Sequence, residues 1–168
     1  MSEAPSASPV FTAHSIRLGD GTFTIAGASR GIESDPRFLA AKRALDVVFP
    51  GDRKGLRIAD LGCLEGGYTV ELARLGFEAV GIEVRKTNFD ACEYVRARVG
   101  LPNLRFVNDD AWNIERYGPF DAVFCCGVFY HLDCPNEFLR LLSRVTRRLL
   151  ILQTHFAERR DLLLWIVR

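Results

Sequence analysis

The stretch Ile58-Ala-Asp-Leu-Gly-Cys-Leu-Glu-Gly-Gly-Tyr-Thr69 decides the fold. Its first residues belong to an apolar run, Leu56–Leu61, that predicts a buried strand. Its last residues begin the segment Tyr68–Leu75, whose apolar residues have helical spacing. The glycines between them let the chain turn sharply, and the start of the helix presents unpaired N–H groups. A strand, a glycine-rich turn and a helix in this order indicate the first unit of an α/β fold.

The alternation of strand and helix continues along the chain. We expect further strands and helices in the order Glu78–Glu83, Thr87–Val99, Leu104–Val107, Phe120–Cys126, Asn136–Arg148 and Leu149–Thr154. A strand that is apolar throughout, such as Phe120–Cys126, must be covered on both faces, which favours parallel pairing with right-handed crossovers. The sequence therefore predicts a doubly wound, mostly parallel α/β sheet.

Three elements are expected before this sheet. Met1–Pro9 is rich in Ser, Pro and Ala and predicts a tail. Two short alternating stretches around Asp20-Gly21 predict a hairpin arm over Ile16–Ile25. A cap at Ser34-Asp35, followed by proline, predicts an amphipathic helix that ends at Pro50-Gly51. We therefore divide the chain into an N-terminal tail and arm, residues 1–34, and a main domain, residues 35–168.

Composition excludes several classes of protein. The chain has 168 residues, of which 48% are hydrophobic, and its 22 Lys and Arg nearly balance 21 Asp and Glu. No whole-molecule field therefore draws it to nucleic acid or to a membrane. The longest apolar run, Leu162–Val167, is far shorter than the roughly 20 residues of a membrane span. Five cysteines without C-x-x-C spacing favour a reduced, cytoplasmic location, and three scattered histidines predict no metal site.

The candidate site lies where ligands of such sheets bind, at the carboxyl ends of the strands. Three further segments lie at or after the ends of later strands: Val80–Glu83, which ends the second strand with a carboxylate, Asn108–Trp112 and Gly127–Pro135. Each alone has an ordinary explanation as a turn, a helix cap or a strand end. Their occurrence in order after successive strands favours a nucleoside ligand. The first turn lacks the G-x-G-x-x-G spacing of dinucleotide sites, which argues against a nicotinamide-dependent oxidoreductase.

These segments resemble the motifs of the class I S-adenosylmethionine-dependent methyltransferases. Asp60-x-Gly62-x-Leu64-x-Gly66 matches the family's acidic-x-G-x-G-x-G pattern except at Leu64, where the family has its middle glycine. The resemblance covers about Leu56–Phe156. It implies the sheet order 3-2-1-4-5 and S-adenosyl-L-methionine as cofactor. The departure at Leu64 implies a loop standing slightly further from the ligand, and it supports an alternative in which the protein is a non-catalytic binding or scaffold protein of this fold.

The resemblance also implies roles for individual residues. Glu83 would accept hydrogen bonds from both ribose hydroxyls, Asp110 would take the adenine amino group and the N–H of Ala111 would reach a ring nitrogen. Tyr130 and His131 would face the reactive methyl and are the candidate catalytic residues. The full set of implied cofactor contacts is Asp60, Gly62, Cys63, Leu64, Gly66, Glu83, Val84, Asp110, Ala111, Trp112, Cys126 and Gly127.

The methyl acceptor is less specified. Gly127–Leu139 is somewhat similar to the corresponding stretch of the tRNA wobble-uridine carboxymethyltransferases, which leaves a tRNA-modifying transferase as an alternative. The near-neutral charge and the absence of an interleaved Arg and aromatic tract favour a small molecule instead. We interpret four arginines, expected mostly on one face of the helix Asn136–Arg148, as a solvated surface; they are Arg140, Arg144, Arg147 and Arg148.

The end of the chain departs from the family, whose sheet usually finishes with an antiparallel hairpin. Only Ala157–Arg168 follow the fifth strand, too few residues for two strands and a helix. We expect Glu158–Val167 to form a helix that lies back on the sheet beside the fifth strand, leaving an open sheet edge for a partner chain, such as a second copy, or for residues absent from this sequence. The arm Ile16–Ile25 is the other local candidate to cover that edge.

Overall fold

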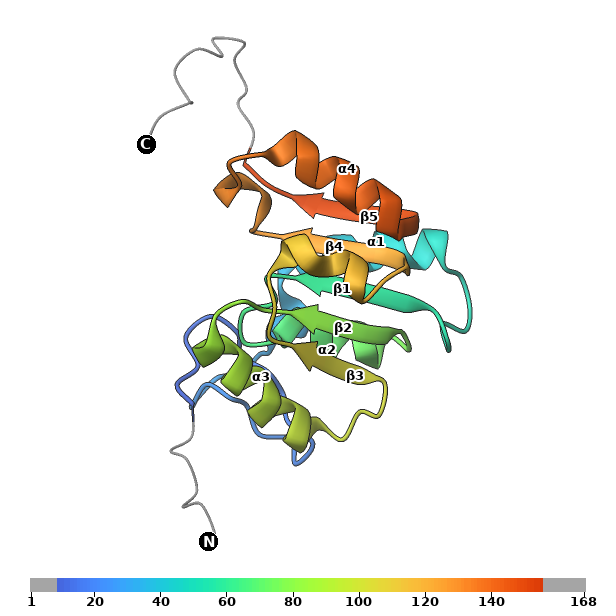
Figure 1. Ribbon diagram of the computed structural model, residues 1–168. Coiled ribbons are helices and arrows are strands. Elements are labelled where there is room, and N and C mark those ends of the chain that lie inside the picture. Colours follow the sequence, from blue (N-terminus) through green and yellow to red (C-terminus); the bar gives the residue numbers. More distant parts are fainter. Residues whose placement is uncertain (1–8, 156–168) are drawn as a thin grey trace, which may run out of the picture.

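Five parallel strands form one sheet in the order β3-β2-β1-β4-β5 in the computed structural model, which describes residues 9–155 (Figure 1). The central strand β1 pairs with β2 on one side and with β4 on the other. The predicted class and strand order are therefore confirmed. The strands are β1 Arg57–Leu61, β2 Glu78–Ile82, β3 Leu104–Val107, β4 Phe120–Cys126 and β5 Thr146–Gln153.

Helices cover both faces of the sheet. They are α1 Pro36–Val48, α2 Gly67–Arg74, α3 Lys86–Val99 and α4 Pro135–Val145, with 3-10 turns η1 Ile32–Ser34, η2 Ala111–Arg116 and η3 Phe129–His131. One buried cluster joins the sheet to α1, α2 and α3, and a second joins it to α4 and η2. Successive β4 residues alternate between the clusters: Ala122 and Phe124 face the first, Val123 and Cys125 the second. This double burial explains why β4 is apolar along its whole length.

The first helix begins where its cap predicts. The side chain of Asp35 accepts a hydrogen bond from the N–H of Arg37, and Pro36 occupies the first helical position, where its missing N–H costs nothing. Phe38, Ala41 and Leu45 form the buried face of α1. The helix ends at Val48, before Pro50, as expected.

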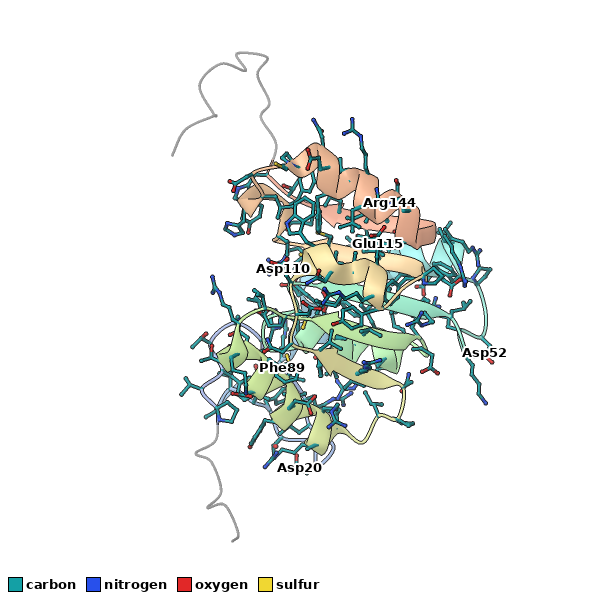
Figure 2. All side chains as sticks on the ribbon, in the orientation of Figure 1. Asp20, Asp52, Phe89, Asp110, Glu115 and Arg144 are labelled. Carbon is teal, nitrogen blue, oxygen red and sulfur yellow. The ribbon has the colours of Figure 1, made fainter. Side chains whose placement is uncertain are left out.

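The predicted helix Asn136–Arg148 is too long at its carboxyl end. It ends at Val145, and β5 begins at Thr146, which pairs with Phe120 across a register irregularity at the start of β4. Pairing with β4 therefore places Arg147 and Arg148 in a strand. The expectation that they share a helical face with Arg140 and Arg144 is wrong. Arg144 on α4 instead pairs with Glu115 of η2, at 2.8 Å (Figure 2).

Arg147 and Arg148 have different neighbours from those of the α4 arginines. Arg147 pairs with Asp121 at 3.6 Å. Arg148 donates to the carbonyl of Val48 at 2.6 Å, and its guanidinium carbon lies 4.4 Å from the centre of the Phe49 ring. These contacts tie the start of β5 to β4 and to the end of α1.

The predicted arm Ile16–Ile25 turns at Asp20-Gly21 but contains one antiparallel bridge, between Arg17 and Phe23, rather than two strands. It lies beside α3, because the N–H of Gly19 donates to the carbonyl of Arg98. The expectation that it could cover the edge at β5 is therefore wrong. Ile16 belongs to the same buried cluster as α1 and α2.

Two further expectations fall outside the structural description. The predicted helix Glu158–Val167 lies outside residues 9–155, as does nearly all of the predicted tail Met1–Pro9. Within the described residues, no helix combines the length and the apolar character needed to cross a membrane. The division of the chain at residue 34 stays a prediction.

Candidate functional site

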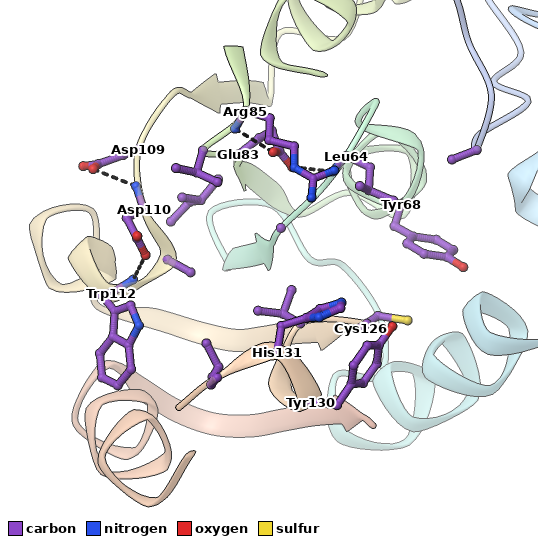
Figure 3. A pocket seen from close by; sticks show the side chains of 18 of the residues that line it. Leu64, Tyr68, Glu83, Arg85, Asp109, Asp110, Trp112, Cys126, Tyr130 and His131 are labelled. Carbon is purple, nitrogen blue, oxygen red and sulfur yellow. Dashed lines mark hydrogen bonds between the residues drawn. The ribbon is translucent and has the colours of Figure 1, made fainter. Parts of the chain in front are cut away.

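A cavity of about 670 Å³ opens at the carboxyl ends of β1, β2, β3 and β4 (Figure 3). This volume falls in the usual range of small-molecule sites, about 300–1,000 Å³. It is lined by residues from the loop after each of these strands and from two N-terminal segments: Ala13, His14, Arg37, Gly62, Leu64, Tyr68, Ile82, Glu83, Val84, Arg85, Asp109, Asp110, Ala111, Trp112, Cys126, Gly127, Val128, Tyr130, His131 and Leu132.

Most of the residues singled out from the sequence line this cavity. Asp60, Cys63 and Gly66 do not, although they lie in or beside the first turn. Cys63 is buried with its sulfur 3.9 Å from that of Cys92. Gly66 is the N-cap of α2 in a left-handed conformation, and a Cβ there would lie 2.6 Å from the Phe106 ring. Their positions support the wall of the cavity, and direct cofactor contacts by these residues stay predictions.

Glu83, which follows β2, is a buried carboxylate with 3% of its surface exposed. Its Oε2 accepts a hydrogen bond from the N–H of Leu64 at 2.9 Å, and its Oε1 accepts one from the N–H of Arg85 at 2.8 Å. A carboxylate offers about four acceptor positions, so lone pairs remain for a ligand that donates two hydroxyls. Glu83 thus joins the first turn to β2 and still presents acceptors at the cavity wall.

Leu64 adopts a left-handed backbone conformation, with φ of 50°. Two hydrogen bonds hold its peptide groups, because its N–H donates to Glu83 and its carbonyl accepts from the Cys92 thiol at 3.0 Å. Its side chain is 38% exposed and lines the cavity. The residue therefore adopts a conformation that favours glycine, at the position where the family pattern has one.

Asp60 lies beneath the turn, fully enclosed. Its Oδ2 accepts a hydrogen bond from the Thr69 hydroxyl at 2.6 Å. Burial, above all, together with the nearby charge of Glu83, raises the pKa of this carboxyl to about 7, against the lowering effect of the Thr69 hydrogen bond. The hydrogen bond connects the end of β1 to α2, so Asp60 fixes the turn that forms one side of the cavity.

The loop after β3 forms one end of the cavity. Asp110 caps η2 by accepting a hydrogen bond from the N–H of Trp112. The carboxylate of Asp109 accepts hydrogen bonds from the Asn113 amide and the Tyr117 hydroxyl. The Trp112 ring packs edge-on against Phe138, with the ring centres 4.9 Å apart, and the residue is 38% exposed. A fixed aromatic surface beside Asp110 therefore borders this end (Figure 3).

The opposite end carries an aromatic cluster formed by the loop after β4 and the residues that follow β5. The ring of Tyr130 stacks parallel to that of His155 with centres 4.1 Å apart, and its centre lies 4.4 Å from that of His131. Tyr130 and His131 line the cavity as neighbours. His155 is not among the residues that the sequence indicates for the site, since no motif marks it.

The N-terminal segment forms part of the cavity wall, which the sequence did not indicate. The Glu65 carboxylate accepts hydrogen bonds from three successive backbone N–H groups, those of Thr12, Ala13 and His14. The Nδ1 atom of His14 accepts a hydrogen bond from the N–H of Gly67 at 3.1 Å. Burial, more than any other cause, lowers the pKa of His14, which favours the neutral ring that this bond requires. These contacts fasten the segment to the start of α2.

The cysteines and acidic residues give no metal centre in the part of the chain that the structure describes, where no group of three or more potential ligands could hold an ion. All five cysteines are free thiols in the structure. Burial is the largest cause that raises the pKa of Cys125 to about 12 and of Cys126 to about 11. Both are therefore protonated and unreactive near neutral pH.

Comparison with known proteins agrees with this geometry. A family profile described as "Methyltransferase domain" matches residues 58–149, more than half of the chain. This chain belongs to that methyltransferase-domain family. The match covers the five strands up to the middle of β5 and the four loops after β1, β2, β3 and β4 that form the cavity.

Individual relatives differ in what their names say. The chain is 32% identical over 93 residues to the ubiquinone biosynthesis O-methyltransferase of Caulobacter sp. (strain K31), covering 55% of this chain and 37% of the relative. It is 30% identical over 115 residues to the tRNA U34 carboxymethyltransferase of Pseudomonas aeruginosa (strain LESB58), covering 62% and 34% respectively. The chain thus spans about a third of the length of these curated relatives.

Among solved structures, the N-terminal domain of EvdMO1 with SAH bound is similar at a TM-score of 0.61 and 33% identity. The similarity covers 78% of this chain and 56% of that one. Magnesium protoporphyrin IX methyltransferase (ChlM) from Synechocystis PCC 6803 with bound SAM has a TM-score of 0.56 at 22% identity, which supports the fold.

Proposed function

We propose that this protein binds S-adenosyl-L-methionine and transfers its methyl group to a small-molecule acceptor. The observation that carries the proposal is the arrangement of the cavity. Glu83 after β2 offers carboxylate oxygens for a diol, and Asp110 with Trp112 after β3 offers an acceptor and an aromatic surface for a base. The similar EvdMO1 domain, crystallised with SAH, supports this assignment.

The chemistry asks little of the protein beyond alignment. When bound, the cofactor supplies an electrophilic methyl on a sulfonium, and the protein must orient the acceptor and exclude water. His131 and Tyr130 line the end of the cavity away from Asp110, where we place the acceptor. His131 accepts a proton from an acceptor that loses one on methylation, and Tyr130 positions that acceptor.

A small acceptor is favoured over RNA by the surface of the described residues. Arginines that could have formed a basic helical face are divided between α4 and β5, and Arg144, Arg147 and Arg148 each contact an acidic side chain or a carbonyl. RNA binding depends on groups of cations left available for phosphates. The similarity to tRNA U34 carboxymethyltransferase keeps tRNA as a second candidate acceptor. Methylation of tRNA, with no activity on substrates free of RNA, would favour this candidate. Self-association through β5 and a cytoplasmic location stay predictions.

Ligand binding tests the proposal directly. S-adenosylhomocysteine at 100 times its dissociation constant should stabilise the fold by about 2.7 kcal/mol, seen as a rise in melting temperature. NADH at the same concentration is the matched control, since the first turn lacks the dinucleotide spacing. A stabilisation by NADH alone, or by neither ligand at millimolar concentration, would remove the proposal. A crystal structure with S-adenosylhomocysteine should then show the ribose hydroxyls on Glu83.

A further inference from the structure

Three consecutive backbone amides converge on one carboxylate in the first turn. The N–H groups of Thr12 and Ala13 donate to Oε1 of Glu65 at 2.7 and 3.2 Å, and that of His14 donates to Oε2 at 2.7 Å. The residue that carries this carboxylate is buried, with 5% of its surface exposed. Hydrogen bonds to an ionised acceptor are stronger than those between neutral groups. Glu65 therefore holds residues 12–14, which we call the wall segment, against the first turn.

The wall segment and the residues before it have few other attachments. Within the described part of the chain, every hydrogen bond made by residues 9–13 goes to Glu65. Val10 is 82% exposed, and a second cavity of about 440 Å³ lies between residues 9–12 and the start of α3. Phe11 packs against the core, with its ring centre 5.9 Å from that of Tyr94. The Glu65 carboxylate is therefore the main polar attachment of this part of the chain.

The chain becomes fixed directly after the wall segment. Ile16 is fully buried, and its N–H donates to the Thr24 hydroxyl at 3.0 Å. That hydroxyl donates in turn to the carbonyl of His14 at 2.9 Å. The wall segment is thus held at two places, by the buried chain at residue 16 and by hydrogen bonds at the first turn. Breaking the bonds at the first turn would let the segment move about residue 16 while the core stays intact.

The wall segment closes one side of the large cavity. Ala13 and His14 line that cavity, whereas Glu65 does not. The His14 ring lies close to the start of α2, where a Cβ on Gly67 would be 2.8 Å from it and where the N–H of Gly67 donates to Nδ1. An effect of Glu65 on a bound ligand therefore passes through the wall segment or through the first turn, and not through direct contact.

We propose that Glu65 is a positioning residue, which holds the wall segment closed over the cavity and so controls how long an adenosyl ligand stays bound. The inference rests on the proposed function. When the bonds to Glu65 break, the wall formed by Ala13 and His14 opens and the ligand can leave. When they form, the closed wall keeps water away from the bound ligand. Glu65 thereby acts on the ligand without touching it.

The dissociation rate of S-adenosylhomocysteine, measured by stopped-flow displacement, tests this role. Glu65→Gln replaces one acceptor oxygen by an NH₂ group, which must face the N–H of either Thr12 or His14. We expect E65Q to release the ligand about 3- to 30-fold faster than the wild type, with a smaller change in the association rate. Thr12→Pro removes one donor from the wall segment and leaves Glu65 in place, so T12P should release the ligand about 2- to 10-fold faster.

Glu71→Gln is the matched control for a loss of stability. Glu71 is buried to a similar extent on α2, pairs with Arg74 and lines neither cavity. E71Q should lower the melting temperature and leave the dissociation rate within about twofold of the wild-type rate. Equal acceleration by E65Q and E71Q would show general destabilisation, and acceleration by E65Q without any by T12P would assign the effect to the first turn. Either result, or an unchanged rate in E65Q, would overturn the proposal.

Amide hydrogen exchange, followed by NMR, tests the closed segment independently of ligand kinetics. In the ligand-free wild type the amides of residues 12–14 should be protected, and in E65Q they should exchange at least about tenfold faster while those of β1 and β4 keep their rates. Saturating S-adenosylhomocysteine should slow their exchange in the wild type, because a ligand enclosed by the wall segment stabilises its closed form.

Two results of the exchange experiment would count against the proposal. Unprotected amides at residues 12–14 of the wild type, or protection that bound S-adenosylhomocysteine leaves unchanged, would overturn it. If no adenosyl ligand binds the wild type, the proposed function fails. The exchange rates of ligand-free wild type and E65Q then still decide whether Glu65 holds the wall segment closed.

Discussion

Replacing Glu83 by glutamine tests whether one carboxylate both holds the first turn and binds the ligand. The wild-type side chain accepts from the N–H groups of Leu64 and Arg85, one on each oxygen. Glutamine keeps the size and one carbonyl oxygen, but its NH₂ group must face one of these two donors. Glu83→Gln therefore leaves a buried N–H unpaired and places a second donor against it.

The expected loss of stability follows from that unpaired donor. A buried polar group without its partner costs about 1–3 kcal/mol, and each kcal/mol lowers the melting temperature of a domain of this size by about 2–4 °C. Glu83→Gln should thus melt about 2–12 °C below the wild type. Loss of the negative charge that accepts from the ribose hydroxyls should weaken S-adenosylhomocysteine by about 1.5–3 kcal/mol, or roughly 10- to 150-fold.

Thermal unfolding and calorimetric titration measure the two effects separately. Glu78→Gln is the matched control, because Glu78 is exposed at the opposite end of the same strand, and it should change neither quantity. A melting temperature equal to that of the wild type would show that the two backbone bonds do not hold the turn. An unchanged affinity together with a lower melting temperature would refute the ribose assignment while leaving the structural role intact.

Further predictions concern pH and the acceptor end. The pKa of Asp60 is raised from 3.8 to about 7 in the folded state, so its contribution to the free energy of unfolding is fully present below pH 3.8 and is lost as pH rises toward 7. Asp60→Asn can still accept from Thr69, so the free energy of unfolding of this variant, measured by urea unfolding at a series of pH values, should not show that loss. His14 has a lowered pKa, so its protonation in the unfolded state destabilises the fold as pH falls below 6.5. His14→Gln keeps an acceptor for the N–H of Gly67, so its free energy of unfolding should depend less on pH in that range. For either residue, a variant whose free energy of unfolding changes with pH in parallel with that of the wild type would contradict the assignment. His131→Ala should keep S-adenosylhomocysteine affinity within about threefold while lowering turnover once an acceptor is known, and a loss of folding would instead make His131 structural.

The sequence predicted the strands and α1 well because their signals are local. Asp35 and Pro36 mark a helix start within two positions, and the unbroken apolar run of β4 requires burial on both faces. The end of α4 could not be located in the same way. Thr146, Arg147 and Arg148 suit either a last helical turn or a first strand segment, and only the pairing of Thr146 with Phe120 decides between them.

The site was predictable to the extent that parallel strands bring their carboxyl ends to one edge. Glu83 and Asp110 follow such strands and line the cavity as expected. Arg37 and His14 do not follow a strand, so no spacing rule indicates them. The placement of His14 depends on contacts between segments about 50 positions apart, such as those of Glu65 with the amides of residues 12–14. Contacts of that kind are a property of the folded chain.

The departure at Leu64 shows how the turn tolerates a change from the family pattern. A leucine with φ of 50° is less favourable than glycine by about 1–2 kcal/mol. Two hydrogen bonds nevertheless fix the peptide groups on both sides of Leu64, because its N–H donates to Glu83 and its carbonyl accepts from the Cys92 thiol. The chain therefore follows the path that glycine would take, and the difference is an added apolar side chain on the cavity wall. The alternative of a non-catalytic binding or scaffold protein rests on the premise that Leu64 disturbs the turn. Since Glu83 lines the cavity with Leu64 bonded to it, leucine at this position alters the shape of the wall rather than the carboxylate oxygens that Glu83 presents there.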